Sequence, residues 1–123
     1  MTKILPLIFF PLLASCAQQG LPNTPGNAIL SSYRALSRQD SFAYVNTLAR
    51  DRREVYESIP GALDSLFNHW RGDSVAVTVR EVNRHNDTAM VVYDLKVSGR
   101  TPKTEDSLIA NVYLEGEGWK LGY

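Results

Sequence analysis

Between residues 24 and 70 the hydrophobic positions recur every three or four residues, which is the period of an amphipathic helix. Thr24 is a residue type that caps helices, and Pro25 suits the first helical turn. Ile29, Tyr33 and Leu36 then follow at the spacing of one helix face. The pattern therefore predicts that a helix opens the folded part of the chain.

Further helical signals continue to Gly72. Either Asp40 or Ser41 can cap a second, short helix, and Asp51 is expected to cap the next one, which holds Val55 and Tyr56. The inner face predicted for the short helix consists of Phe42, Val45 and Ala49. A final helical stripe consists of Leu63, Leu66, Phe67 and Trp70.

After Gly72 the period changes to two, which is typical of strands. Alternating segments are separated by polar or glycine-containing turns at 83–88, 98–105 and 116–118. They predict an antiparallel meander of about four strands, packed on one face by the preceding helices, and thus an α+β fold. The outer face predicted for this sheet is half apolar and holds Val82, Met90, Val92, Ile109 and Tyr113.

A different apolar segment stands at the N-terminus. After Lys3, every residue from Ile4 to Ala14 is apolar except Pro6 and Pro11. The run is shorter than the roughly 20 residues that a membrane-spanning helix needs. A positive charge before it and small residues after it are typical of a secretory signal peptide, which we assign to residues 1–15.

The end of this segment resembles the lipobox of bacterial lipoproteins. Leu13, Ala14, Ser15 and Cys16 provide an aliphatic residue, two small residues and the cysteine of that motif. The resemblance implies a diacylglycerol thioether on Cys16 and cleavage between Ser15 and Cys16. The alternative is an ordinary secretory signal whose cysteine is incidental.

Lipidation would make the mature protein a membrane-anchored one, with residues 16–23 as lipidated cysteine and tether and residues 24–123 as one domain. Two or more acyl chains anchor stably, while one chain does not. The expected location is the bacterial cell envelope. In a Gram-negative bacterium the outer membrane is favoured, because Ala17 stands where the lipoprotein resemblance associates Asp with inner-membrane retention.

Composition excludes several classes of protein. A single cysteine cannot form a disulfide within the chain and does not fit a cysteine-rich zinc site. Thirteen basic residues balance 13 acidic ones, which argues against a nucleic-acid-binding protein. We therefore predict no metal, no cofactor and no nucleic acid partner.

The order of elements resembles the nuclear transport factor 2-like superfamily, and in particular small bacterial lipoproteins of unknown function with that cone-shaped fold. The matching segments are residues 24–25, 33–36 with Asp40 after them, 89–97, and the closing Gly118, Trp119, Lys120 and Leu121. The resemblance covers nearly all of residues 24–123. It implies a pocket between the helices and the sheet, in a fold that hosts isomerases, dehydratases and cyclases as well as ligand-binding and interaction modules.

An isomerase-type site needs a carboxylate base facing this pocket together with an oxyanion partner. None of the candidate carboxylates is expected to face the pocket: Asp40 is predicted to cap a helix, Asp64 to be solvated and Asp94 to point outward. His69 suits a helix C-terminus, and His85 lies in a polar turn. We therefore assign no catalytic residue.

The residues expected to line the pocket are aromatic: Tyr33, Phe67, Trp70, Tyr93 and Trp119. The predicted function is a lipid-anchored, non-enzymatic module that binds a small ligand or a protein. The alternatives are a small isomerase, dehydratase or cyclase that uses the pocket, and a structural envelope protein that acts through the outer sheet face. The expected partners are the membrane through Cys16 and a small apolar ligand, with a homodimer through the sheet face as a further candidate.

Overall fold

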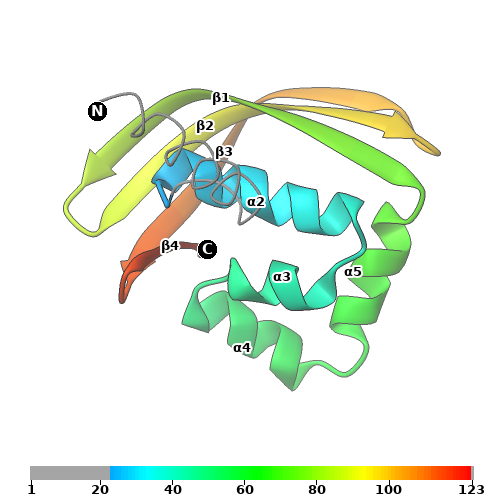
Figure 1. Ribbon diagram of the computed structural model, residues 1–123, viewed down its shortest axis with the longest axis horizontal. Helices are drawn as coiled ribbons and strands as arrows, with labels where there is room; N and C mark the ends of the chain where they lie inside the picture. Colours follow the sequence, from blue (N-terminus) through cyan, green and yellow to red (C-terminus); the bar gives the residue numbers. More distant parts are fainter. Residues whose placement is uncertain (1–22, 123) are drawn as a thin grey trace, which may run out of the picture.

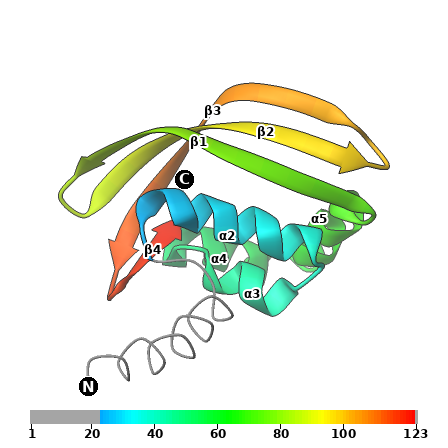
Figure 2. The ribbon, with the colours of Figure 1, turned by 45° about the horizontal axis from the view of Figure 1, so that its top comes forward.

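The computed structural model describes residues 23–122, which form a curved sheet with helices on its concave side (Figure 1; Figure 2). The elements are α2 (Pro25–Ser37), α3 (Ser41–Asn46), α4 (Arg50–Ser58), α5 (Ala62–Trp70), β1 (Asp73–His85), β2 (Thr88–Gly99), β3 (Lys103–Glu115) and β4 (Gly118–Leu121). Within these residues the sheet order is β1-β2-β3-β4, and every neighbouring pair is antiparallel. The predicted α+β class, helices first and a meander after them, is confirmed.

Helix α2 begins as its sequence predicts. Thr24 is the N-cap, its hydroxyl accepts a hydrogen bond from the Asn27 backbone N–H at 3.3 Å, and Pro25 follows at the first helical position. Ile29 and Leu36 are buried on the predicted face. This face packs α2 against the sheet, so the first helix fixes one wall of the space between the two layers.

Helix α3 is capped by Asp40, whose carboxylate accepts from the Ala43 backbone N–H at 3.1 Å. The predicted inner face of this helix was wrong: Phe42 is 78% exposed, whereas Tyr44 is only 3% exposed. The helix ends at Asn46, so Ala49 lies outside it and cannot share a helix face with Phe42. The prediction continued the helical spacing from Phe42 to Ala49, but the chain leaves the helix after Asn46.

Helix α4 starts through contacts with the sheet and not through a side-chain cap from its own N-cap residue. Asp51 was predicted to cap it, but Ala49 is the N-cap and Asp51 lies in the first turn. The backbone N–H of Ala49 donates to the carbonyl of Leu121 in β4 at 2.6 Å. This contact is long-range in sequence, so no local pattern could reveal it.

A bulge in β1 changes which face its second half presents. Val79 pairs with Tyr93 while Glu81 pairs with Val92, so Arg80 is an extra residue in β1. Val82 therefore pairs with the buried Val91 and lies on the helix-facing side, contrary to the predicted outer face. The outer face still carries apolar side chains, of which Ile109 is 63% exposed.

The first hairpin turn is shorter than predicted. The polar stretch 83–88 was expected to form a turn, but β1 continues to His85 and its residues pair with Met90, Ala89 and Thr88. Only Asn86 and Asp87 connect the strands, with Asn86 at a left-handed φ of 56° that asparagine tolerates. Residues 83–85 are polar because this end of the edge strand β1 is exposed to solvent, and not because the strand ends before them.

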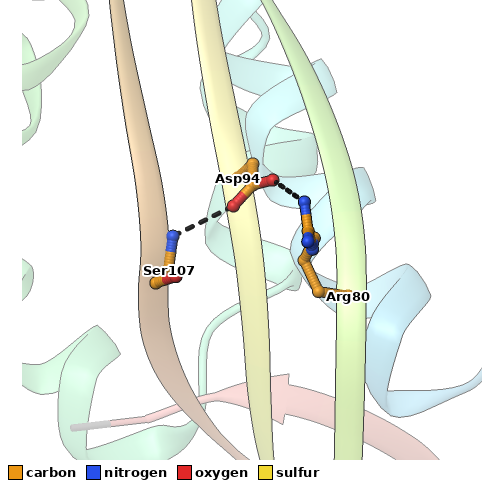
Figure 3. A network of polar contacts seen from close by, with 3 residues as sticks. All are labelled: Arg80, Asp94 and Ser107. Atoms are coloured by element: carbon orange, nitrogen blue, oxygen red, sulfur yellow. Dashed lines mark hydrogen bonds and ion pairs between the residues drawn. The ribbon is translucent and has the colours of Figure 1, made fainter.

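A second register shift lies between β2 and β3, where Tyr93 pairs with Leu108 but Leu95 pairs with Glu105, so β3 has an extra residue there. The carboxylate of Asp94 connects both irregular points on the convex face of the sheet (Figure 3). It forms an ion pair with the Arg80 guanidinium at 2.7 Å and accepts from the Ser107 backbone N–H at 2.9 Å. The hydrogen bond from Ser107, aided by Arg80, holds the pKa of the Asp94 carboxyl below its usual value of 3.8. Asp94 thus points outward, as predicted, and has a structural role.

Replacing Asp94 with asparagine should lower the melting temperature by a few degrees at neutral pH. Because the folded-state pKa of Asp94 is depressed, its contribution is present above the unfolded-state pKa near 4 and is lost as the pH falls through the folded-state value. The gap between wild type and Asp94→Asn, measured by calorimetry, should therefore close toward pH 3. Asp106→Asn, which changes an exposed carboxylate on β3, is the control. A gap that stays constant with pH would contradict this assignment.

Candidate functional site

A cavity of about 430 Å³ lies between the helices and the inner side of β3, within the size range of small-molecule sites. Helices α2, α3, α4 and α5 each contribute to its wall, and the end of β4 closes one side. Its aromatic lining consists of Tyr33, Tyr44, Tyr56, Trp70 and Tyr93. Arg52 and Asn111 add polar groups. The cavity is thus an aromatic chamber with a small number of hydrogen-bonding groups.

The tyrosines of α2 and β2 meet at this cavity. The hydroxyl oxygens of Tyr33 and Tyr93 are 3.0 Å apart, and the ring of Tyr33 also makes an edge contact with Trp70 at a centroid distance of 6.1 Å. Burial, followed by the hydrogen bond to Tyr93, raises the pKa of the Tyr33 hydroxyl above its ordinary value. Tyr33 therefore stays protonated at neutral pH and keeps a hydrogen to donate.

A second tyrosine pair comes from α3 and α4. The hydroxyl oxygens of Tyr44 and Tyr56 are 3.5 Å apart, and their rings meet edge to face at a centroid distance of 6.1 Å. Arg52 lies one turn before Tyr56 on α4 and donates to the carbonyl of Gly122 at 3.4 Å. Arg52 belongs to a basic run at the start of α4, with Arg50 and Arg53, but it is half-buried and lines the cavity.

The structure brings three of the five predicted pocket residues to the cavity and places two elsewhere. Tyr33, Trp70 and Tyr93 line it. Phe67 is buried in the core, edge-on to Tyr44 at 5.7 Å between ring centroids. Trp119 is buried near the other end of the sheet, with the Arg84 guanidinium 4.9 Å from its ring centroid.

The carboxylates and histidines weighed as catalytic candidates lie away from this lining. Asp40 caps α3, and Asp64 is exposed on α5. His69 and His85 are exposed as well. Among residues 23–122, no Asp, Glu or His lines the cavity, no three or more His, Cys, Asp or Glu side chains gather as a metal site, and no helix is long and apolar enough to cross a membrane. Cys16 lies outside the described residues.

Sequence reasoning missed Tyr44, Tyr56 and Arg52 as cavity residues. Tyr44 shares its short helix with the more apolar Phe42, which was chosen for the inner face. The available signal was the spacing of Arg52 and Tyr56, which are four residues apart and therefore share one side of α4.

Comparisons with known proteins identify the architecture. No protein-family model matches the chain, and no curated protein is similar to it in sequence. A SEC-C motif-containing protein of Rhodopseudomonas palustris superposes with a TM-score of 0.67 at 14% identity, over 81% of this chain and 76% of that one. An NTF-2 like protein of unknown function from Shewanella oneidensis superposes with a TM-score of 0.53 at 17% identity, over 80% of this chain and 94% of that one. The domain has the nuclear transport factor 2-like fold.

A third structural neighbour was solved with a bound ligand. A Mycobacterium tuberculosis protein, solved in complex with estradiol-17β-hemisuccinate, superposes with a TM-score of 0.50 at 14% identity, over 83% of this chain and 95% of that one. Identities this low establish the shared fold alone. The cavity between helices and sheet in this chain is therefore the cone interior that the sequence resemblance implied for an NTF2-like domain.

Proposed function

We propose that this NTF2-like domain binds a small molecule with an apolar ring body and at least one oxygen acceptor inside the cone cavity. The observation that carries the proposal is the 430 Å³ chamber with its aromatic walls. Aromatic side chains provide large contact areas for an apolar ligand and favour edge-to-face packing against rings. A small number of polar groups in such a chamber orients the ligand.

The Tyr33 and Tyr93 pair supports an acceptor on the ligand. One hydroxyl hydrogen is shared between the two oxygens, so the hydrogen of the second hydroxyl remains to donate. Because burial keeps Tyr33 neutral, the pair offers a donor and not a base. This favours binding over the alternative of an isomerase, dehydratase or cyclase, whose proton transfer needs a group that ionises near the working pH.

The ligand of the Mycobacterium tuberculosis protein is a useful probe for this proposal. Estradiol-17β-hemisuccinate combines a rigid apolar ring system with oxygen acceptors at its ends. It matches the chemistry of the chamber, namely rings for the aromatic walls and an acceptor for the tyrosine pair.

The two tryptophans provide an internal reporter and its control. Trp70 lines the cavity and Trp119 does not, so a Trp119→Phe variant keeps the reporting tryptophan and a Trp70→Phe variant keeps the silent one. Titration with estradiol-17β-hemisuccinate should change the fluorescence of Trp119→Phe saturably and leave that of Trp70→Phe flat. Adding Tyr33→Phe and Tyr93→Phe together, which removes both hydroxyl hydrogens, should weaken binding about fivefold, the value of one hydrogen bond near 1 kcal/mol. A fluorescence change in Trp70→Phe but not in Trp119→Phe would place the ligand near Trp119, outside the cavity, and would refute the proposal.

We also propose that the domain works at the bacterial cell envelope, held there by a lipid on Cys16. The lipobox resemblance of residues 13–16 supports this placement. At the start of the described residues, the Asn23 amide bonds to β4 and to the turn before it: its Oδ1 accepts from the Trp119 backbone N–H at 3.0 Å, and its Nδ2 donates to the Glu117 carbonyl. The seven Cα-to-Cα steps from Cys16 to Asn23 span at most about 25 Å, so the β3–β4 turn would lie near the membrane surface.

A further inference from the structure

A second hollow, of about 270 Å³, lies between α2 and β1, the edge strand of the sheet. Figure 2 shows these two elements side by side. We call the hollow the α2–β1 groove. Its apolar floor consists of Leu30, Val75 and Val77, all half-buried. Tyr33 borders both this groove and the cone cavity, but the other groove residues do not line the cavity. The groove is therefore a separate candidate site.

Two arginines stand at the rim of the α2–β1 groove. Arg34 lies in the last turn of α2 and Arg38 is its C-cap, and the Arg38 backbone N–H donates to the Arg34 carbonyl, so both side chains share one side of the helix. Within residues 23–122 neither guanidinium has an ion pair or a side-chain hydrogen bond. Two like charges at this spacing repel each other, and a bound anion would relieve that repulsion.

Two carboxylates are already engaged: that of Asp40, two residues after Arg38, and that of Asp73, next to Ser74 of the groove. Asp40 accepts from the Ala43 backbone N–H at 3.1 Å. Asp73 is buried at the start of β1 and accepts from the Thr101 backbone N–H at 3.1 Å. These two carboxylates therefore do not neutralise the positive charge of Arg34 and Arg38.

Hydroxyl groups complete the polar side of the groove. Ser37 accepts a hydrogen bond from the Val75 backbone N–H at 3.1 Å, which leaves its own hydrogen to donate. Ser74 lines the groove with an exposed hydroxyl. The groove thus combines two guanidinium groups and two hydroxyls above an apolar floor.

We propose that the α2–β1 groove binds an amphipathic organic anion, a carboxylate or phosphate ester that carries a short apolar chain. The anionic group lies between Arg34 and Arg38, because guanidinium groups bind carboxylate and phosphate oxygens in a fork. The chain covers Leu30, Val75 and Val77, whose apolar surface it removes from water. This site does not depend on the ligand proposed for the cone cavity.

Three probes separate the parts of this proposal: hexanoate, hexylammonium and acetate. They vary the charge at constant chain length and the chain length at constant charge. In amide NMR titrations at neutral pH, hexanoate should shift the resonances of Leu30, Ser74 and Val77 saturably. Hexylammonium should leave them in place, and acetate should bind at least about tenfold more weakly because it lacks the chain. Added salt should weaken hexanoate binding.

Variants test the role of the arginines. Arg34→Gln with Arg38→Gln should weaken hexanoate binding at least about tenfold, while Lys96→Gln, which removes a positive charge from the exposed convex face, should not change it. Both arginines are exposed, so the variants should fold. Equal binding of hexanoate and hexylammonium, no shift with hexanoate, or no effect of the double variant would overturn the proposal. Shifts confined to Tyr93 and Trp70 would also overturn it, and would point to the cone cavity instead.

Discussion

Replacing Gly99 with alanine should lower the free energy of unfolding by about 3 kcal/mol. Gly99 has a φ of 124°, a conformation that residues with a side chain rarely adopt. A Cβ atom at this position would lie 2.4 Å from the carbonyl oxygen of Gly72 and 3.1 Å from the Cα of Asp73. Both neighbours are backbone atoms at the start of β1, so the contact can be relieved only by moving the strand.

Gly116→Ala is the matched control. Gly116 also has a positive φ, 63°, but a Cβ atom there would meet nothing within 4 Å. Only the conformational cost of about 1 kcal/mol should remain at this position. Both variants can be compared by denaturant unfolding, with the slope checked for constancy. Equal losses at the two glycines would show that backbone conformation alone matters and that the close approach to Gly72 does not.

The junction at Gly99 also positions one wall of the cone cavity. Arg100 next to it donates to the carbonyls of Asn68 and His69, at 3.3 and 2.9 Å, at the C-terminal end of α5. A cation suits this end of a helix. Since α5 carries Trp70 into the cavity lining, Gly99→Ala should also alter the fluorescence of Trp70 in the folded protein.

Local sequence signals predicted the parts of this fold that local physics decides. The Thr24 cap with Pro25, the Asp40 cap of α3 and the alternation along β2 all depend on residues close in sequence, and each is present in the structure. Tyr93 was expected to face inward from its parity with Val91 and Leu95, and all three are buried. Parity was reliable here because the extra residues at the two register shifts lie in β1 and β3, so β2 alternates without interruption.

Bulges and long-range contacts account for what was missed. The extra residue Arg80 reverses the facing of Val82, and it is held by Asp94 on a neighbouring strand. The start of α4 is fixed by Leu121, more than 70 residues away from Ala49. The cavity lining joins Tyr44 with Tyr56 through an interhelical contact. None of these pairings has a signal within a short window of sequence.

Replacing Cys16 with serine should abolish lipid attachment entirely. The proposed anchor is a thioether, which a serine hydroxyl does not form in place of the thiol, and in the lipoprotein resemblance cleavage follows lipidation. The variant should therefore take up no labelled fatty acid and should keep residues 1–15. Intact mass spectrometry measures both effects at once. Cys16 lies outside residues 23–122, so we expect the domain to remain folded in the variant. A wild-type mass equal to the cleaved chain without lipid would instead establish an ordinary secretory signal.

A second substitution separates lipidation from sorting. Ala17→Asp leaves Cys16 and the residues before it unchanged, so labelling and cleavage should persist. In a Gram-negative host, membrane fractionation should then find the wild type in the outer membrane and Ala17→Asp in the inner one. Stable anchoring in either membrane requires at least two acyl chains, since one chain binds only marginally. If both proteins are lipidated but fractionate together, the anchor stands and the dependence of its location on residue 17 is wrong.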